Sequence, residues 1–457
     1  MVEMFKVKDT EHYDYPQLSI FNDAVGNSRF ENLIKKNTYK PDRNTVLYVH
    51  VPFCKSFCVF CNYYKVKPEK KVVDQFVEAI IVELKHYSET LPSEVKIISA
   101  VHFGGGTPSS IGITGLQRIV DTINKSFTVK EDCLFSTEGH IRELQDAEFI
   151  KELKRIGFKR VSFGVQSFTP EIRKKYGLLP VRQVEQTLHN LAEYGFDDYN
   201  IDLMYNFPEQ HFEEIIGDIN RAFEYGVNCI DLYSLNVFPN TRMEGFMKKN
   251  ETYKKYIDID QRYAYTGIYN YLQNDKECNM VMSNTISRKS DRPNLYLETH
   301  LGANKLDGGR IIGVGPSSRG YLDGFIYKNY VNVNDYVKAI HESRHARHLE
   351  HELTECERQN RLFVMFPNFT YLRIEDAVFN EFTRKTMDLL LENKYVYEDD
   401  KKFYIKPVDC YWAGNISGMF YSGEQKEKMI KTLLLNRKNK LNMYNQDKMQ
   451  IVEREDI

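Results

Sequence analysis

The sequence lacks long hydrophobic runs and carries almost no net charge. Nowhere do about eighteen or more uncharged apolar residues follow one another, which excludes an ordinary transmembrane helix. Residues 1–9 contain no apolar core of a signal peptide. The 62 basic and 64 acidic residues give a formal net charge of −2, which offers no electrostatic reason to bind nucleic acid or a membrane surface. We therefore expect a cytoplasmic protein with no membrane span and no nucleic-acid partner.

Cysteine is also scarce, with eight residues in a chain of 457. Disulfide frameworks belong to exported chains, so these few cysteines in a long chain without export signals indicate a reducing compartment. A zinc site built from two cysteine pairs is not expected either, because there is no second pair. Five of the eight are widely separated single residues: Cys133, Cys229, Cys278, Cys356 and Cys410.

The other three cysteines lie together. Cys54, Cys58 and Cys61 are spaced four and three residues apart, directly after the apolar run 46–51. On one short loop, three thiols can turn toward one point, which suits an iron–sulfur cluster. A cubane has four irons, so three cysteines leave one iron open to a small molecule. Phe60 would shield such a cluster, which is expected to be sensitive to oxygen. A structural zinc with an unidentified fourth ligand and a chance grouping are the alternatives.

Short β-branched and aromatic runs alternate with helical stretches from Val46 onward, which is typical of βα units. Six consecutive parallel units with right-handed crossovers would curl into an open α/β fold, a (βα)6 partial TIM barrel. The expected strands are 46–51, 97–103, 133–137, 160–165, 199–205 and 229–236.

The chain divides into three expected parts. Residues 1–40 show no firm periodicity and are expected to form an N-terminal arm. Residues 41–330 contain the barrel, with an edge strand at 278–288 and a glycine-rich turn after the apolar run that begins at 310. Residues 331–457 are expected to form a smaller, mostly helical domain that covers the substrate. Its expected elements are helices at 334–347, 355–366 and 374–392, a hairpin at 395–404 and a terminal helix after 423.

Polar and glycine-rich motifs follow the predicted strands. Gly104-Gly105-Gly106-Thr107-Pro108 follows the second strand, where glycines allow a ligand to approach the backbone and free amides could bind a carboxylate. Glu138, Gln166 and Asp202 lie at or near the ends of the next three strands, where barrel active sites are found. Each feature alone could be an ordinary turn or a satisfied core polar group. Together they suit a ligand with amino, carboxylate and ribose groups.

These motifs together resemble the radical SAM superfamily, over residues 48–320. Within it, the chain is similar to the branch typified by oxygen-independent coproporphyrinogen dehydrogenase (HemN). Two strings, Thr137-Glu138-Gly139-His140 and Asp231–Pro239, are similar to the haem-utilisation enzymes of the HutW/ChuW type, the anaerobilin synthases. The superfamily resemblance is carried by Cys54-x-x-x-Cys58-x-Phe60-Cys61, Gly104–Pro108, Gly164–Phe168 and Ile201–Tyr205.

The resemblance implies a set of site residues. Cys54, Cys58 and Cys61 would hold a [4Fe-4S] cluster whose open iron chelates S-adenosylmethionine. Arg319 is a candidate contact to the first cofactor or to a substrate carboxylate. A flavodoxin- or ferredoxin-like protein would supply the electron. Two molecules of S-adenosylmethionine are implied, and the residues expected to contact one or the other are Tyr48, Phe60, Gly105, Gly106, Thr107, Glu138, Gln166, Asp202 and Ser234.

The sequence departs from the family pattern at three places. Leu178 stands where the branch has an arginine twelve residues after the glutamine, and Arg182 is the candidate replacement. His140 stands where the haem-utilisation subgroup has arginine. Residues 206–210 read Asn-Phe-Pro-Glu-Gln in place of Gly-Leu-Pro-Gly-Gln.

The resemblance implies a radical SAM methyltransferase that methylates and opens the macrocycle of haem or a related tetrapyrrole and releases iron. Four alternatives share part of the pattern: a HemN-type coproporphyrinogen dehydrogenase, a methyltransferase of a natural product, a HemW-type haem chaperone, and a structural cluster protein.

Two further segments have an ordinary and a functional interpretation. Four histidines at 341, 345, 348 and 351 would share one helix face and could bind haem or a metal, although a solvated face is the commoner case. Residues 410–415 contain the only tryptophan and either close the substrate pocket or pack between domains, of which we favour packing.

Overall fold

The computed structural model describes residues 30, 34, 43–196, 198–238, 241–249, 251–273, 278–288 and 309–427. Apart from Phe30 and Ile34, the predicted N-terminal arm lies outside these residues, and so does almost all of the predicted terminal helix. Among the helices that the structure describes, none is both long and apolar enough to cross a membrane.

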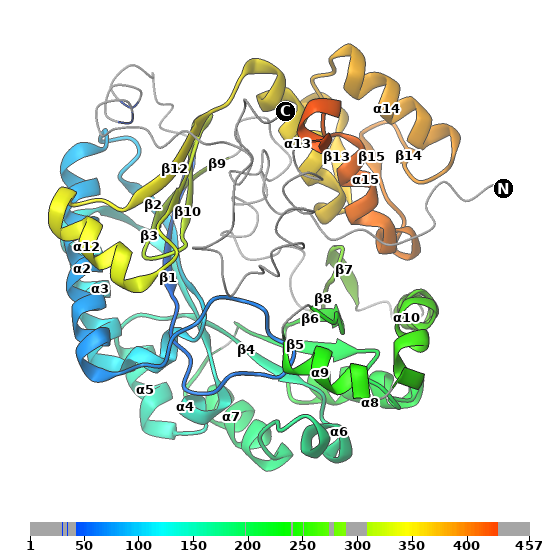
Figure 1. Cartoon of the computed structure of the whole chain (residues 1–457), viewed down its shortest axis with the longest axis horizontal. Coiled ribbons are helices and arrows are strands. Elements are labelled where there is room, and N and C mark those ends of the chain that lie inside the picture. Colours follow the sequence, from blue (N-terminus) through cyan, green and yellow to red (C-terminus); the bar gives the residue numbers. More distant parts are fainter. Residues whose placement is uncertain are drawn as a thin grey trace.

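Six parallel strands form the centre of the structure in chain order (Figure 1). Each pairs in parallel with the next, which confirms the predicted (βα)6 partial barrel. The strands are β1 Asn44–Val51, β2 Ile97–Gly105, β3 Thr128–Gly139, β4 Arg160–Gln166, β5 Asp198–Tyr205 and β6 Cys229–Ser234.

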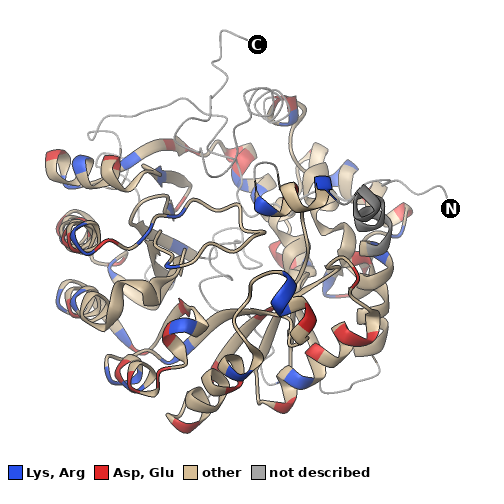
Figure 2. Cartoon of the chain, turned by 60° about the horizontal axis from the view of Figure 1, so that its bottom comes forward, with Lys and Arg blue, Asp and Glu red and all other residues tan. Residues whose placement is uncertain are grey.

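Helices cover the outer face of these strands (Figure 1). Acidic and basic residues are mixed along them (Figure 2), as the near-zero net charge leads us to expect. The helices are α2 Lys70–Thr90, η2 Pro108–Ile111, α3 Gly112–Ser126, α4 Ile141–Leu144, α5 Ala147–Arg155, α6 Pro170–Lys175, α7 Val181–Glu193, α8 Phe212–Glu224, α9 Arg242–Lys249 and α10 Glu251–Leu272.

Strand alternation separates an apolar outer face from a polar inner face. Leu47 and Val49 of β1 are fully buried in the main apolar core, which also contains Phe76 and Ile80 of α2, four residues apart and therefore on one helix face. Burial of each such side chain stabilises the fold by about 1.5–3 kcal/mol. Tyr48 lies between Leu47 and Val49, so its side chain is on the opposite face of the strand. Polar groups at such positions line the inside of the barrel.

The sheet extends beyond the predicted barrel at both edges. β9 Gly309–Val314 pairs in parallel with the free edge of β1, so β1 has a parallel partner on each side. The predicted edge strand at 278–288 is a hairpin that pairs with β6. The sheet has twelve strands, and the remaining ones are β7 Asn279–Met282, β8 Thr285–Ser287, β10 Arg319–Leu322, β11 Phe325–Asn329 and β12 Arg347–Glu352. It therefore runs past the boundary predicted near residue 331.

The prediction of a histidine-bearing helix at 334–347 is wrong from residue 344 onward, because the helix ends at Ser343. Helix α12 Val333–Ser343 is capped by Asn332, whose side chain accepts from the Asn334 amide over 2.8 Å. The chain leaves the helix at Arg344, in a left-handed conformation with φ +63°, and enters β12. Pairing of β12 with β11 overrides the helical spacing. His341 is on the helix, whereas His348 and His351 are on a strand, so the four histidines share no helix face.

The C-terminal elements form a small unit beside the sheet (Figure 1). The tryptophan segment packs as favoured: the Tyr265 hydroxyl of α10 donates to the Pro407 carbonyl over 3.2 Å, and the Arg262 guanidinium lies 5.2 Å from the buried Trp412 ring. The helix predicted at 374–392 begins only at 381, where Asn380 caps it. The elements are α13 Glu355–Phe369, β13 Tyr371–Arg373, η3 Ile374–Asp376, α14 Glu381–Glu392, β14 Tyr397–Glu398, β15 Lys402–Tyr404, η4 Pro407–Trp412 and α15 Ala413–Met419.

A buried glutamate ties α2 to the sheet extension. The Glu83 carboxylate accepts hydrogen bonds from the Gly315 amide at 2.9 Å, the Asn329 side chain at 2.8 Å and the Tyr336 hydroxyl at 2.7 Å. Burial raises its pKa to about 7, although these hydrogen bonds oppose the increase. Glu83 thereby fixes the turn between β9 and β10 against the first barrel helix.

We expect Glu83→Gln to lower the free energy of unfolding by about 2 kcal/mol at pH 5 and by less at pH 8, because the glutamine NH2 group cannot accept from the donors that the carboxyl oxygens satisfy. The folded pKa lies above the ordinary value of 4.5. The unfolded chain therefore loses this proton first, and the contribution of Glu83 to stability falls as pH rises from about 4.5 to about 7. Urea unfolding at several pH values measures both effects.

Glu78→Gln is the matched control for this substitution. Glu78 lies on the same helix, but its side chain is 58% exposed in an ion pair with Arg118. It should change stability by less than about 0.5 kcal/mol. Equal unfolding midpoints for the Glu83 and Glu78 variants would contradict the proposed role of Glu83 in fixing the turn between β9 and β10 to α2.

Candidate active site

The three cysteines occupy a closed loop at the C-terminal end of β1. The Cys54 amide donates to the Val66 carbonyl over 3.0 Å, and the Val66 amide donates to the Pro52 carbonyl over 2.9 Å. Cys54 is buried, whereas Cys58 and Cys61 are half-buried. The two ends of the loop are thus joined by backbone hydrogen bonds, and all three thiols lie within it.

The thiols interact with one another in an environment that disfavours their ionised form. Burial raises the pKa of Cys58 to about 11, and the neighbouring Cys61 and Cys54 add to the increase. Burial also raises the pKa of Cys54, against a hydrogen bond of 3.3 Å with the Thr107 hydroxyl. Thiolates are the form that binds iron, so a bound metal centre would supply the positive charge that stabilises them.

This arrangement suits a cluster better than a single ion. Among the described residues, no three His, Cys, Asp or Glu side chains stand close enough to hold one metal ion. In a cubane each cysteine binds a different iron, so the sulfur atoms stand further apart than the ligands of one zinc. The cysteine loop therefore offers three thiols, which is the donor type and number that a cluster with one open iron needs.

The glycine motif permits a close approach of β2 to its neighbours. A Cβ on Gly104 would lie 2.9 Å from a Glu138 carboxylate oxygen, and one on Gly105 would lie 2.7 Å from the His50 ring. Gly105 also has φ +113°, which side chains disfavour. The prediction of free amides is wrong for Gly105 and Gly106. The Gly105 amide donates to Glu138 over 3.1 Å, and the Gly106 amide donates to the Val51 carbonyl over 2.8 Å.

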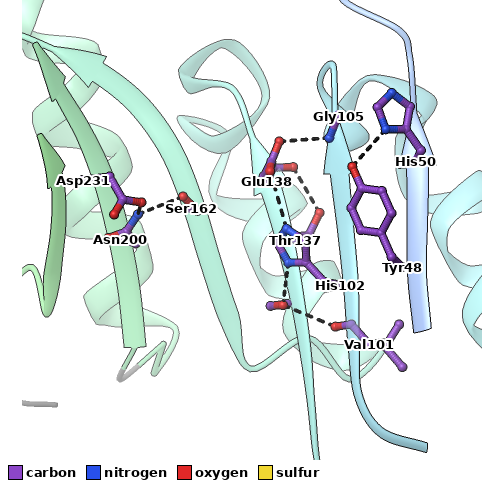
Figure 3. A network of polar contacts seen from close by, with 11 residues as sticks. Tyr48, His50, Val101, His102, Gly105, Thr137, Glu138, Ser162, Asn200 and Asp231 are labelled. Atoms are coloured by element: carbon purple, nitrogen blue, oxygen red, sulfur yellow. Dashed lines mark hydrogen bonds and ion pairs between the residues drawn. The ribbon is translucent and has the colours of Figure 1, made fainter. Parts of the chain in front are cut away.

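A polar network lines the inner face of β1, β2 and β3 (Figure 3). The Tyr48 hydroxyl and His50 Nδ1 are 2.9 Å apart, and the Tyr48 ring stacks on His102 with centroids 6.0 Å apart. His102 contacts the Ser136 hydroxyl at 2.8 Å and Glu138 at 3.4 Å. Sequence reasoning did not single out His50 or His102, although both occupy inward positions of their strands. The network fixes Tyr48 and Glu138, two predicted site residues, relative to each other.

Two aspartates lie side by side on the inner face of β5 and β6. Asp202 and Asp231 are direct partners in the parallel ladder. Asp231 accepts from the Asn200 side chain over 2.7 Å (Figure 3). It also accepts from the Thr285 hydroxyl. Burial raises the pKa of both aspartates, and the charge of Asp231 raises that of Asp202 further, whereas Arg160 opposes the increase. Two adjacent buried carboxylates favour sharing one proton.

Gln166 ends β4 in a left-handed conformation with φ +67°. The Arg173 guanidinium donates to the carbonyls on both sides of it, that of Val165 at 2.7 Å and that of Ser167 at 2.6 Å. The Gln166 amide nitrogen folds over Gly164, where a Cβ would stand only 2.2 Å away. Arg173 therefore holds the strained backbone, and Gly164 leaves room for the predicted side chain.

The remaining predicted residues lie around this rim. Ser234 is buried at the end of β6, and Phe60 packs with Leu178 and Met204 in a separate apolar cluster. Leu178 thus fills space beside the cysteine loop. Arg182, the proposed replacement for the missing arginine, is exposed on α7. Arg182 therefore does not supply a buried charge at the rim.

His140 and the last predicted contact complete the placement. His140 caps α4 by accepting from the Arg142 amide over 3.1 Å, so it takes a structural position where the subgroup has arginine. Arg319 begins β10 and is half-buried. Thr107 is buried against Cys54, as described above. The structure therefore places the predicted residues at the C-terminal ends of the strands and at the sheet extension beside them.

Comparison with protein families identifies the barrel. Residues 48–222 match the model of the Radical SAM superfamily. The chain carries a radical SAM domain. A [4Fe-4S] cluster and S-adenosylmethionine are the cofactors of this family.

Proteins similar to this chain include a heme chaperone, an anaerobilin synthase and a coproporphyrinogen III oxidase. The heme chaperone HemW of Lactococcus lactis is 28% identical over 304 residues, which are 64% of this chain and 73% of that protein. The anaerobilin synthase of Escherichia coli O157:H7 is 30% identical over 211 residues, 46% of this chain and 47% of that enzyme. The solved structure of coproporphyrinogen III oxidase (HemN) from Escherichia coli shares the fold, with a TM-score of 0.71, 20% identity, and 87% and 93% of the two chains covered.

We expect Gly164→Ala to weaken binding of S-adenosylmethionine about tenfold while leaving stability almost unchanged. The new methyl group would displace the Gln166 amide, the movable end of a long side chain, and so remove one hydrogen bond to a charged ligand. Equilibrium dialysis with labelled cofactor measures the affinity. Gly217→Ala is the control, because a Cβ there meets nothing within 4 Å. Unchanged affinity in the Gly164 variant would remove Gln166 from the proposed contacts.

Proposed function

We propose that this radical SAM enzyme methylates and opens the haem macrocycle without oxygen and releases the iron. The observation that carries the proposal is the position of the three-cysteine loop beside the Gly105–Glu138 contact, at one rim of the barrel. The Thr137–His140 and Asp231–Pro239 strings and the anaerobilin synthase match support haem as the substrate over other tetrapyrroles.

We propose separate sets of residues for the cluster and for S-adenosylmethionine. Cys54, Cys58 and Cys61 would hold the cluster and leave one iron open. When bound, the cluster and S-adenosylmethionine supply the one-electron cleavage that starts radical chemistry, with the electron coming from a flavodoxin- or ferredoxin-like donor. We propose that the cofactor contacts are Tyr48, Phe60, Gly105, Gly106, Thr107, Glu138, Gln166, Asp202, Ser234 and Arg319.

The inner face of the barrel would orient these ligands and hold a proton near them. Burial raises the pKa of both Asp202 and Asp231, which favours a proton on the pair, and a protonated pair would both donate and accept hydrogen bonds with ribose hydroxyls. Tyr48 and Glu138 are fixed through His50 and His102. A rigid, buried polar wall of this kind limits both water and stray hydrogen donors around a reactive radical.

A haem chaperone of the HemW type is the second candidate function. Its support is the longer match, which covers 73% of the Lactococcus lactis chaperone against 47% of the anaerobilin synthase. A chaperone would bind haem and transfer it intact. A HemN-type coproporphyrinogen dehydrogenase shares the barrel motifs but not the two strings, whereas a natural-product methyltransferase shares the barrel motifs and part of the strings.

Anaerobic incubation of the reconstituted enzyme with haem, reductant and S-adenosylmethionine tests the proposal. We expect loss of the Soret band together with formation of S-adenosylhomocysteine and 5′-deoxyadenosine, because methyl transfer and radical initiation each consume one cofactor molecule. Absorbance spectra and chromatography of the products measure these changes. Haem that binds with an intact Soret band would favour the chaperone and refute ring opening.

Cys58→Ala should abolish the iron–sulfur absorbance of the reconstituted protein, because two cysteines cannot hold the cluster in a site with one open iron. Cys356→Ala is the matched control, since this thiol is exposed on α13 and far from the loop in sequence. Iron content and the visible spectrum provide the measurement. A Cys58 variant that retains both cluster and turnover would refute the ligand assignment.

A further inference from the structure

Arginine and lysine face each other on the sheet extension beside the candidate active site. Arg319 of β10 and Lys328 of β11 are direct partners in the antiparallel ladder. Side chains at such positions share one face, with Cβ atoms about 5 Å apart, and like charges there destabilise the pair. Both residues are half-buried, whereas most of their neighbours on these two strands are buried. Two cationic side chains thus stand side by side at partly exposed positions on one face of the sheet extension.

This pair lies on the same face as the polar wall of the barrel. β1 and β9 are parallel neighbours, and β9 pairs with β10 through Ile311 and Tyr321. Two residues before Tyr321, Arg319 shares its face. The charge of Lys328 is felt by His50, whose pKa burial and Lys328 together lower to about 4. The basic pair therefore belongs to the wall that begins with Tyr48 and His50.

Apolar groups and a third cation surround the pair. Tyr321, Ile326 and Leu349 belong to one apolar cluster on this part of the sheet. Leu349 is the ladder partner of Lys328, and Ile326 is that of Tyr321. The Arg361 guanidinium of α13 lies 4.6 Å from the Tyr321 ring centroid. An anionic group is the ligand chemistry that matches the cations on this face.

We propose that Arg319 and Lys328 together bind a carboxylate of the tetrapyrrole substrate. This inference rests on the proposed function for the identity of the ligand, since haem carries two propionate groups on a flat apolar macrocycle. A carboxylate between the two cations would form charge-assisted hydrogen bonds with both. The pair thereby sets which edge of the macrocycle faces the sheet extension and which faces the cysteine loop.

The electrostatic environment of Lys328 agrees with this assignment. Burial and the charge of Arg319 lower the pKa of Lys328 to about 7. Burial lowers the pKa of Arg319 to about 10. His348 of β12 also faces Lys328, and burial together with that charge lowers its pKa against the attraction of Asp335. Negative charge brought between these groups would favour their protonated forms.

Anaerobic absorbance titration with haem and with haem dimethyl ester tests the proposal. The ester keeps the macrocycle and iron but blocks both carboxylates. In the full-length protein without added S-adenosylmethionine, we expect Lys328→Met to weaken haem binding about tenfold and ester binding less than twofold. Arg319→Met should likewise weaken the binding of haem more than the binding of the ester. Retained affinity for the ester shows that a variant is folded.

Two further variants make the comparison specific. Lys338→Met removes one charge from the exposed side of α12, where the lysine side chain is 73% exposed, and should bind both ligands like the wild type. Lys328→Arg should retain the preference for haem. In the wild type this preference should decline as pH rises above about 7, because a neutral lysine must then take up a proton to bind. The arginine variant should lack that decline, since its guanidinium stays charged.

The outcomes separate this inference from the proposed function. Equal binding of haem and its ester by the wild type, or equal loss of both ligands in the Lys328 variant, would overturn the carboxylate site. If the Lys328 variant loses its preference for haem over the ester and the wild type does not open the ring, the carboxylate site is supported and the methyltransferase is refuted. A wild type that binds neither ligand would overturn both proposals. If Arg319→Met affects only cofactor binding, its part in the carboxylate site is wrong.

Discussion

Parallel pairing on both edges of β1 is the constraint on which the site depends. β2 on one side and β9 on the other hold this strand in the middle of the sheet. Its inward residues therefore sit in a continuous polar wall, and its C-terminal end opens directly into the cysteine loop. An edge strand would leave Tyr48 and His50 facing solvent on one flank. With β9 in place, the wall extends to β10 and β11, and the cysteine loop and the Arg319–Lys328 pair flank the same inner face.

Close backbone approach is the second requirement. Gly104, Gly105 and Gly106 each occupy a position where a side chain would collide with Glu138, with His50 or with the backbone after β1. Gly164 plays the same part under Gln166. The polar groups thus reach their positions because neighbouring strands carry no side chain there, and Arg173 compensates for the backbone strain that this tight packing leaves at Gln166.

The local features of this molecule could be predicted from the sequence, whereas the long-range ones could not. The β-branched and aromatic content of residues 46–51 and 97–103 predicts strands. The spacing of Cys54, Cys58 and Cys61 predicts the cluster. The pairing of β9 with β1 joins segments more than 250 residues apart, for which no local pattern exists. Residues 341–351 have helical histidine spacing, but Arg347–Glu352 form a strand because β11 offers an edge for pairing. Lys328 gave no signal, since its role follows from the residue opposite it.

The closed cysteine loop keeps its backbone anchorage separate from its sulfur chemistry. Backbone hydrogen bonds between Cys54, Val66 and Pro52 join the ends of the loop without any help from the thiols. The barrel below it is held by strand pairing and by apolar burial against α2. The place of the loop on the barrel is therefore set by groups other than the three sulfur atoms.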